Sequence, residues 1–173
     1  SEEALRPSEL LHSHPRDTGA GAMTTATQNH RTAALTVFDI DQAGRLTGLS
    51  TTQLQRWDRT GFFHPSLADP NRRRAYSRIY SLDDVIALRT IAKIRAVGVP
   101  LTRLKPILPL LVPDEQGNWP ARSLCVSGTQ VFASREEAEA AAGSGREDAP
   151  KCFDLASVLA EVKAGIARLG DRG

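Results

Sequence analysis

The chain has 173 residues, a normal hydrophobic fraction of 40% and few aromatic residues. This length holds one domain of ordinary size or two small ones, so an enzyme active site would have to be compact and a binding module is favoured. No apolar run approaches the roughly 20 residues that are needed to cross a bilayer, so we expect no membrane partner.

Positive charge is gathered in one part of the chain. Residues 44–105 hold twelve Lys or Arg against four Asp or Glu, a net charge of about +8, although the whole chain carries only +2. A polyanionic partner responds to this local distribution rather than to the total. The segment therefore favours binding to a polyanion such as DNA.

Residues 1–36 are predicted to be a disordered leader, because they are rich in Ser, Thr, Ala, Gly and His and show little apolar periodicity. Met23 is a candidate for the natural start, which would make residues 1–22 an upstream extension. This stretch lacks the apolar run of a secretory signal.

Two short helices are predicted after the leader. Asp39 followed by Gln42, and Ser50 followed by Gln53, are capping-box patterns that open these helices. Apolar residues follow each cap at helical spacing, and a glycine ends each helix. Because only a short turn separates the two helices, the pattern predicts a helix-turn-helix.

Residues 62–80 are predicted to form a β-hairpin wing, in which aromatic residues flank a proline turn and an arginine run. Ser81 and Asp84 then cap a third helix that runs to Gly98, and a fourth helix starts after it. Pro106 and Pro109 should bend this fourth helix or end it early. We take these prolines as a domain edge, which gives a winged helix-turn-helix domain over residues 37–111 and a small module over residues 112–173.

The C-terminal module is predicted to be α+β. Residues 124–126 and 130–132 form a second hairpin, residues 134–142 a short helix and residues 143–150 a loop. Residues 154–169 form an amphipathic helix whose apolar stripe we predict to be a dimerisation seam. The seam consists of Leu155, Val158, Leu159, Val162, Ile166 and Leu169. The predicted fold class is mainly α with small β, a winged helix-turn-helix domain followed by an α+β module that ends in this dimerisation helix.

The sequence contains no pattern typical of a metal site or of catalysis. Cys125 and Cys152 stand far apart without a C-x-x-C partner, so we expect buried free thiols in a reducing cytosol rather than a disulfide framework or a zinc site. The four histidines show no metal or triad spacing, and neighbouring carboxylates belong to first helical turns. Because no phosphate loop or nucleophile motif occurs, we predict no metal, no cofactor and no enzymatic activity.

The second helix of the helix-turn-helix is expected to enter the major groove of DNA with its N-terminal turn. There Gln pairs with adenine, Arg pairs with guanine and threonine methyls contact thymine, while the arginines of the wing contact phosphates. For Trp57 we favour packing in the core over a phosphate contact of its indole N–H. The candidate DNA-binding residues are Ser50, Thr51, Thr52, Gln53, Gln55, Arg56, Trp57, Arg59, Arg72, Arg73, Arg74, Tyr76, Arg78 and Tyr80.

Several motifs occur in a familiar order: Ile-x-x-Ala-x-x-Leu-Thr-Gly-Leu-Ser at residues 40–50, the helix at 54–61, Arg-Ile-Tyr-Ser at 78–81 and an Asp-x-x-x-Leu helix that ends at Gly98. Together they make residues 38–108 resemble the MerR family of winged-helix regulators. The resemblance implies that Thr52, Gln55, Arg56 and Trp57 face the duplex. It also implies that Arg78 and Tyr80 belong to a wing that grips the flanking backbone.

The same resemblance implies a two-fold dimer on a pseudo-palindromic site, with distortion of promoter DNA that repositions polymerase elements. Members of the family usually continue the fourth helix into a long dimerisation helix, whereas a hairpin and a loop intervene here. The C-terminal part is therefore atypical. Metal-sensing members carry cysteines near the dimer helix, and the two cysteines of this chain do not match that spacing.

The sequence thus predicts a bacterial, cytoplasmic transcriptional regulator that binds double-stranded DNA sequence-specifically as a homodimer and is associated with the nucleoid when bound. RNA polymerase is a further expected partner. Two alternatives stay open: an antitoxin-type autorepressor whose C-terminal module binds a small partner protein, and an architectural or recombination factor that bends DNA. No pattern identifies the target sequence, the effector or the choice between activation and repression.

Overall fold

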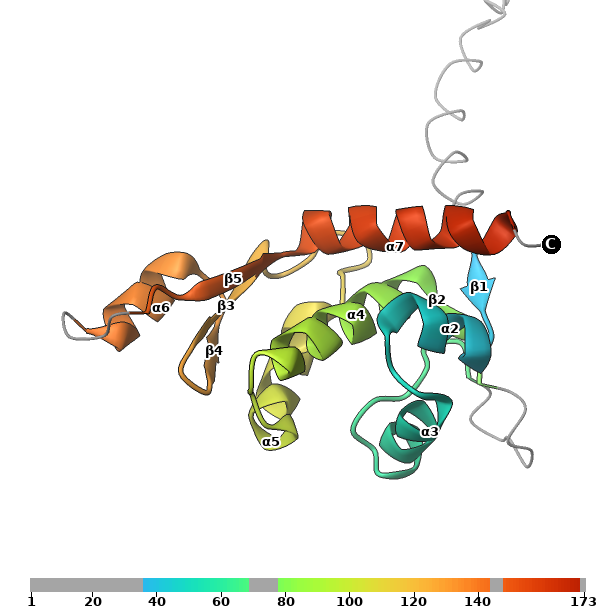
Figure 1. The fold of residues 1–173 in the computed structure, drawn as a ribbon, viewed down its shortest axis with the longest axis horizontal. Coiled ribbons are helices and arrows are strands. Elements are labelled where there is room, and N and C mark those ends of the chain that lie inside the picture. The colour runs from blue at the N-terminus through green and yellow to red at the C-terminus, as the bar shows by residue number, and fades with distance from the viewer. Residues whose placement is uncertain (1–35, 69–77, 144–147, 172–173) are drawn as a thin grey trace, which may run out of the picture. The chain divides into compact units, whose positions relative to one another are not determined.

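The computed structural model describes residues 36–68, 78–143 and 148–171 (Figure 1). These residues are mainly helical and carry two small antiparallel sheets. The elements in chain order are β1 (Val37–Phe38), α2 (Ile40–Thr47), α3 (Thr51–Arg59), β2 (Tyr80–Ser81), α4 (Leu82–Ala96), α5 (Leu101–Leu104), the 3-10 helix η1 (Lys105–Leu111), β3 (Ser123–Ser127), β4 (Gln130–Phe132), α6 (Arg135–Ala142), β5 (Lys151–Asp154) and α7 (Leu155–Gly170). Within the described ranges no helix is long and apolar enough to span a membrane.

Capping boxes fix the starts of α2, α3 and α4. The Asp39 carboxylate accepts a hydrogen bond from the Gln42 N–H at 2.8 Å, and the Gln42 side chain accepts one from the Asp39 N–H at 3.0 Å. Reciprocal pairs of the same kind open α3 and α4. Each pair satisfies two backbone N–H groups that have no partner within the helix. The predicted N-termini of these three helices are therefore confirmed.

The turn between α2 and α3 depends on two glycines and a buried threonine. A Cβ atom at Gly44 would lie 2.9 Å from the carbonyl oxygen of Leu49, and Gly48 ends α2 with a φ of 76° that favours glycine. The buried Thr47 hydroxyl donates to the Ala43 carbonyl at 2.7 Å and accepts from the Leu49 N–H at 3.3 Å. The predicted helix-turn-helix is thus present, and its turn is closed by hydrogen bonds and close backbone packing.

The helix α4 forms the centre of the core, where it contacts α2, α7 and β2. Its fully buried apolar side chains are Val85, Leu88, Ile91 and Ile94. The helix that follows, α5, passes into η1 at Lys105, because Pro106 and Pro109 lack the N–H groups that an α-helix would need. The predicted early end of the fourth helix is confirmed.

The predicted wing is only partly covered by the described residues, since residues 69–77 lie outside them. On the C-terminal side of this gap, Tyr80 lies opposite Phe38, so that β2 pairs with β1. The sequence does not reveal this pair of strands, because two residues are too few to show the alternation of a strand.

The C-terminal sheet has the strand order β4-β3-β5. The strands β3 and β4 form the predicted second hairpin, and α6, capped by Ser134, is the predicted short helix. The third strand, β5, lies between the predicted loop and the predicted helix and includes Asp154, the first residue of that helix. Its four residues are too few for a periodic pattern, and the strand exists because it pairs with β3.

The prediction of free thiols is wrong. Cys125 in β3 lies opposite Cys152 in β5, and a disulfide joins them at a Cα–Cα distance of 4.0 Å. The two residues are 27 positions apart in sequence, and only the pairing of β5 with β3 brings them together. Because β5 cannot be recognised from the sequence, the disulfide cannot be recognised either.

The C-terminal helix α7 packs on its own chain, along α4 and α2 (Figure 1). Leu155, Val158 and Val162 are buried there, so half of the predicted dimerisation seam is used within the chain. The other half, Leu159, Ile166 and Leu169, is partly exposed, although these side chains also pack against the core. Residues 37–111 and 112–173 therefore contribute to one core, and their division into two domains stays a prediction.

Candidate nucleic-acid interface

The helix α3 presents one polar face to solvent. Thr52, Arg56 and Arg59 are exposed and follow one another at helical spacing, with the partly exposed Gln55 beside them. The only acidic residue of α3, Asp58, is buried. The exposed face of α3 therefore carries hydrogen-bonding groups and positive charge without a carboxylate.

The first turn of α3 is held by its cap. The Ser50 hydroxyl accepts from the Gln53 N–H at 3.1 Å, and Gln53 Oε1 accepts from the Ser50 N–H at 3.0 Å. These two predicted DNA-binding residues therefore have a structural role, because they fix the turn from which Thr51 and Thr52 project. Contacts of Ser50, Thr51 or Gln53 with DNA stay a prediction.

Trp57 lies in the core, as favoured from the sequence. Its side chain is only 4% exposed, and its ring meets that of Phe62 edge-on at a centroid distance of 5.0 Å. The guanidinium of Arg95, from α4, lies 5.7 Å from the centre of the indole ring. Trp57 thus connects α3 to α4, and a contact of its indole N–H with DNA stays a prediction.

A buried ion pair ties α3 to the base of the predicted wing. The Asp58 carboxylate accepts from Arg78 Nε at 2.7 Å, and the two side chains are 8% and 11% exposed. The other Asp58 oxygen lies 2.8 Å from His64 Nδ1. Tyr80 is buried beside this base. Arg78 and Tyr80 are thus largely buried in the chain, and their predicted contacts with the DNA backbone stay a prediction.

The remaining candidates of the wing are Arg72, Arg73, Arg74 and Tyr76. All four lie outside the described residues, so their role as contacts to the DNA backbone stays a prediction. The candidate interface that the structure does describe is the exposed face of α3.

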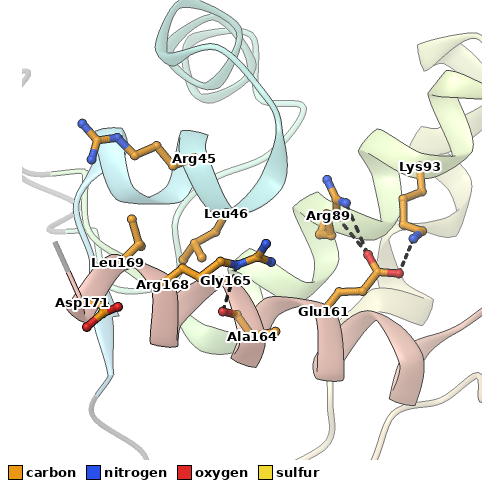
Figure 2. A pocket seen from close by; sticks show the side chains of 10 residues that line it. All are labelled: Arg45, Leu46, Arg89, Lys93, Glu161, Ala164, Gly165, Arg168, Leu169 and Asp171. Carbon is orange, nitrogen blue, oxygen red and sulfur yellow. Dashed lines mark hydrogen bonds and ion pairs between the residues drawn. The ribbon is translucent and has the colours of Figure 1, made fainter.

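A second group of polar side chains, not foreseen from the sequence, connects this helix-turn-helix to α7 (Figure 2). Glu161 of α7 accepts from Lys93 Nζ at 2.5 Å and from two nitrogens of Arg89, at 3.3 and 3.4 Å. Arg89 also donates to the carbonyl oxygen of Thr47, in the turn of the helix-turn-helix, at 3.3 Å. The hydrogen bond from Lys93 and the charges of both cations hold the pKa of Glu161 below its ordinary value.

These contacts join residues 42 to 72 positions apart, so sequence spacing contains no signal for them. The one sequence feature related to these contacts is the net positive charge of residues 44–105. Within that segment, basic residues such as those on α4 outnumber the acidic residues. In the described part of the chain, no three metal-binding side chains gather at one place.

The fold and the exposed face of α3 define the chain as a helix-turn-helix protein of the kind that binds DNA. Residues 38–111 match the model of the MerR HTH family of regulatory proteins. This part of the chain is therefore a helix-turn-helix region of the MerR type, and that family suggests DNA-binding transcription regulation. A search of curated proteins gives no match to the chain.

Proposed function

We propose that this protein is a transcriptional regulator that reads a specific DNA sequence through the exposed face of α3. The observation that carries the proposal is the composition of that face. Thr52, Gln55 and Arg56 supply the groups that pair with base edges in the major groove, and no exposed acid on α3 repels the duplex. We place the protein in the bacterial cytoplasm, bound to the nucleoid.

The arginines of the wing complete the proposed interface. Arg72, Arg73 and Arg74 contact phosphates of the flanking backbone, while Arg59, near the end of α3, contacts a phosphate at the edge of the groove. The ion pair of Asp58 with Arg78 supports this arrangement, because it fixes the base of the wing relative to α3.

The regulator binds as a homodimer to a pseudo-palindromic site. Leu159, Ile166 and Leu169 of α7 are partly exposed, and we propose these side chains as the contact between two copies. This contact is narrower than the seam predicted from the sequence, since Leu155, Val158 and Val162 serve the core of their own chain. Two-fold symmetry then places two copies of α3 about one helical turn apart on the DNA.

Genome-wide footprinting, followed by fluorescence anisotropy on the recovered site, tests the proposal. We expect a palindromic consensus, and we expect Gln55→Ala and Arg56→Ala each to cost about 1–3 kcal/mol in binding the site, with relaxed specificity at one base pair. Arg135→Ala is the matched control, because it removes an exposed arginine of α6 and should leave specificity unchanged.

Two outcomes would contradict the proposal. Weak binding that does not depend on sequence and is insensitive to Gln55→Ala and Arg56→Ala would exclude sequence-specific regulation. A consensus without two-fold symmetry would exclude the dimer while leaving base reading by α3 intact.

One observation favours the antitoxin-type alternative as a second candidate. In the sheet β4-β3-β5, both outer strands pair only with β3 among the described strands, so each has a free edge to which a partner protein can add a strand. Purification of the tagged chain with a small protein in stoichiometric amount would favour this candidate over an autonomous regulator.

A further inference from the structure

The disulfide between Cys125 and Cys152 joins two different parts of the fold. Cys125 belongs to the central strand β3, and Cys152 belongs to β5, which runs directly into α7. Neighbouring residues of a strand point to opposite faces, and Leu124 and Val126 of β3 face the main core. The disulfide therefore lies on the other face of the sheet, outside the core that stabilises the helix-turn-helix.

The two cysteines differ in access to solvent. Cys125 is fully buried, whereas Cys152 is partly exposed at the edge strand of the sheet. A small thiol therefore has better access to Cys152 than to Cys125. This asymmetry gives the pair one site of attack and one protected leaving group.

A continuous set of contacts leads from Cys152 to the helix-turn-helix. The side chain of Asp154, two residues after Cys152, caps α7, and the Leu155 N–H donates to the Arg122 carbonyl at 3.0 Å, next to β3. One turn beyond the first buried residues of α7, Glu161 binds Arg89, which in turn holds the carbonyl of Thr47. Through Glu161 and Arg89, α7 is therefore connected to the turn that orients α3.

The helix α7 contacts the helix-turn-helix without covering α3. In Figure 1, α7 runs along α4 and α2 on the side away from α3, and α7 makes its principal contacts with α4 and α2. The two helices pack closely, because a Cβ atom on Gly165 of α7 would lie 2.9 Å from Leu46 Cδ2 of α2. A change in the docking of α7 can thus alter α2 and the turn while the reading face of α3 stays open to DNA.

We propose that Cys125 and Cys152 form a reversible redox site, which reacts with low-molecular-weight thiols and disulfides and whose oxidation strengthens DNA binding by holding α7 against the helix-turn-helix. This rests on the proposed function, which places the chain in a cytoplasm where thiols are kept reduced and where disulfides are transient or sensory. A stable structural disulfide would be the expectation only in an oxidising compartment.

In reduction, a thiolate RS⁻ attacks the Cys152 sulfur, the Cys125–Cys152 bond breaks, and Cys125 leaves as a thiolate that takes up a proton. A second RS⁻ attacks the R sulfur of the mixed disulfide, which releases RSSR and the Cys152 thiolate. Two thiols are oxidised to one disulfide and the protein disulfide is reduced to two thiols. Oxidation by RSSR is the reverse of these two steps.

The test uses the full chain equilibrated in glutathione buffers of stepped redox potential, with the disulfide fraction measured by thiol trapping and mass spectrometry. Anisotropy then gives the affinity of the oxidised and reduced forms for the footprinted site, and hydrogen exchange gives the protection of the α7 amides. We expect the oxidised form to bind at least about fivefold more tightly and its α7 amides to exchange at least about fivefold more slowly.

Two variants serve as controls. Cys125→Ser with Cys152→Ser should bind DNA equally in every buffer, because the redox-active pair is absent. Glu161→Ala should keep the disulfide but narrow the difference in affinity, because the contact with Arg89 is lost.

Equal affinities of the two wild-type forms would overturn the proposal, as would a pair that stays reduced in the most oxidising buffer. If neither form binds any DNA site, the proposed function fails, and α7 exchange alone decides on the redox site. Slower exchange in the oxidised form then supports the redox control of α7, and unchanged exchange overturns it.

Discussion

The hydroxyl of Thr47 connects the end of α2 to the start of α3. It donates to the Ala43 carbonyl and accepts from the Leu49 N–H in a fully buried position. Thr47→Val keeps the shape of the side chain but leaves the Leu49 N–H without this acceptor. We expect the free energy of unfolding, measured by urea denaturation, to fall by about 1–3 kcal/mol.

Thr90→Val is the matched control for this substitution. Thr90 is equally buried in α4, but its hydroxyl only donates to the Ile86 carbonyl, at 2.8 Å, one turn earlier in the same helix. Valine at this position leaves no backbone N–H without an acceptor, so its cost should be clearly smaller. Equal costs at the two positions would show that the bond to Leu49 does not stabilise the turn.

The docking of α7 as an element should depend on pH through Glu161. Lys93 and Arg89 lower the pKa of this carboxyl in the folded chain. The contribution of the ionised carboxylate to the free energy of unfolding is therefore fully present above the pKa of the unfolded chain, and it is lost as the pH falls through the lower pKa of the folded chain. Because the Glu161 side chain is 41% exposed, we expect this contribution to the free energy of unfolding to be at most about 1 kcal/mol at neutral pH.

Urea denaturation of the wild type and of Glu161→Gln between pH 7 and pH 3 measures this contribution. The difference in unfolding free energy should shrink towards zero as the pH falls, and high salt should reduce it. Glu139→Gln, which removes an exposed pair with Arg135 inside α6, serves as the control and should change stability less. A difference for Glu161→Gln that does not vary with pH would exclude an ionic contribution.

Elements with local signals were predictable from the sequence. Capping pairs such as Asp39 with Gln42 mark helix starts, because both partners lie within one turn. The strands β1 and β5 and the disulfide were not predictable, since each depends on pairing between residues far apart in the chain.

In the candidate site, too, only the features with local sequence signals were predictable. Helical spacing was enough to place Thr52, Gln55 and Arg56 on one accessible side of α3. The inward positions of Arg78 and Tyr80 could not be predicted, because they depend on Asp58 and on strand pairing with Phe38. Charge and residue type alone do not reveal whether an arginine meets an acid of its own chain or a phosphate.

The whole molecule should unfold in one step. Trp57 reports on the helix-turn-helix and Trp119 on the C-terminal part, and both belong to residues that are packed in one cluster. In each single-tryptophan variant, Trp57→Phe and Trp119→Phe, fluorescence and far-UV circular dichroism should give coincident urea transitions. Separate transitions for the two tryptophans would instead support two independent domains, as the sequence predicts.

The burial of α7 also constrains how the protein can fold during its synthesis. A nascent chain that has been made only as far as α6 contains every residue of the helix-turn-helix but lacks Leu155, Val158 and Val162, which fill the core behind it. Domains generally fold in the order in which they leave the ribosome. Here the DNA-binding part, although made first, must wait for α7 before its core is complete, so a ribosome-bound chain that stops before α7 would expose apolar surface of α2 and α4.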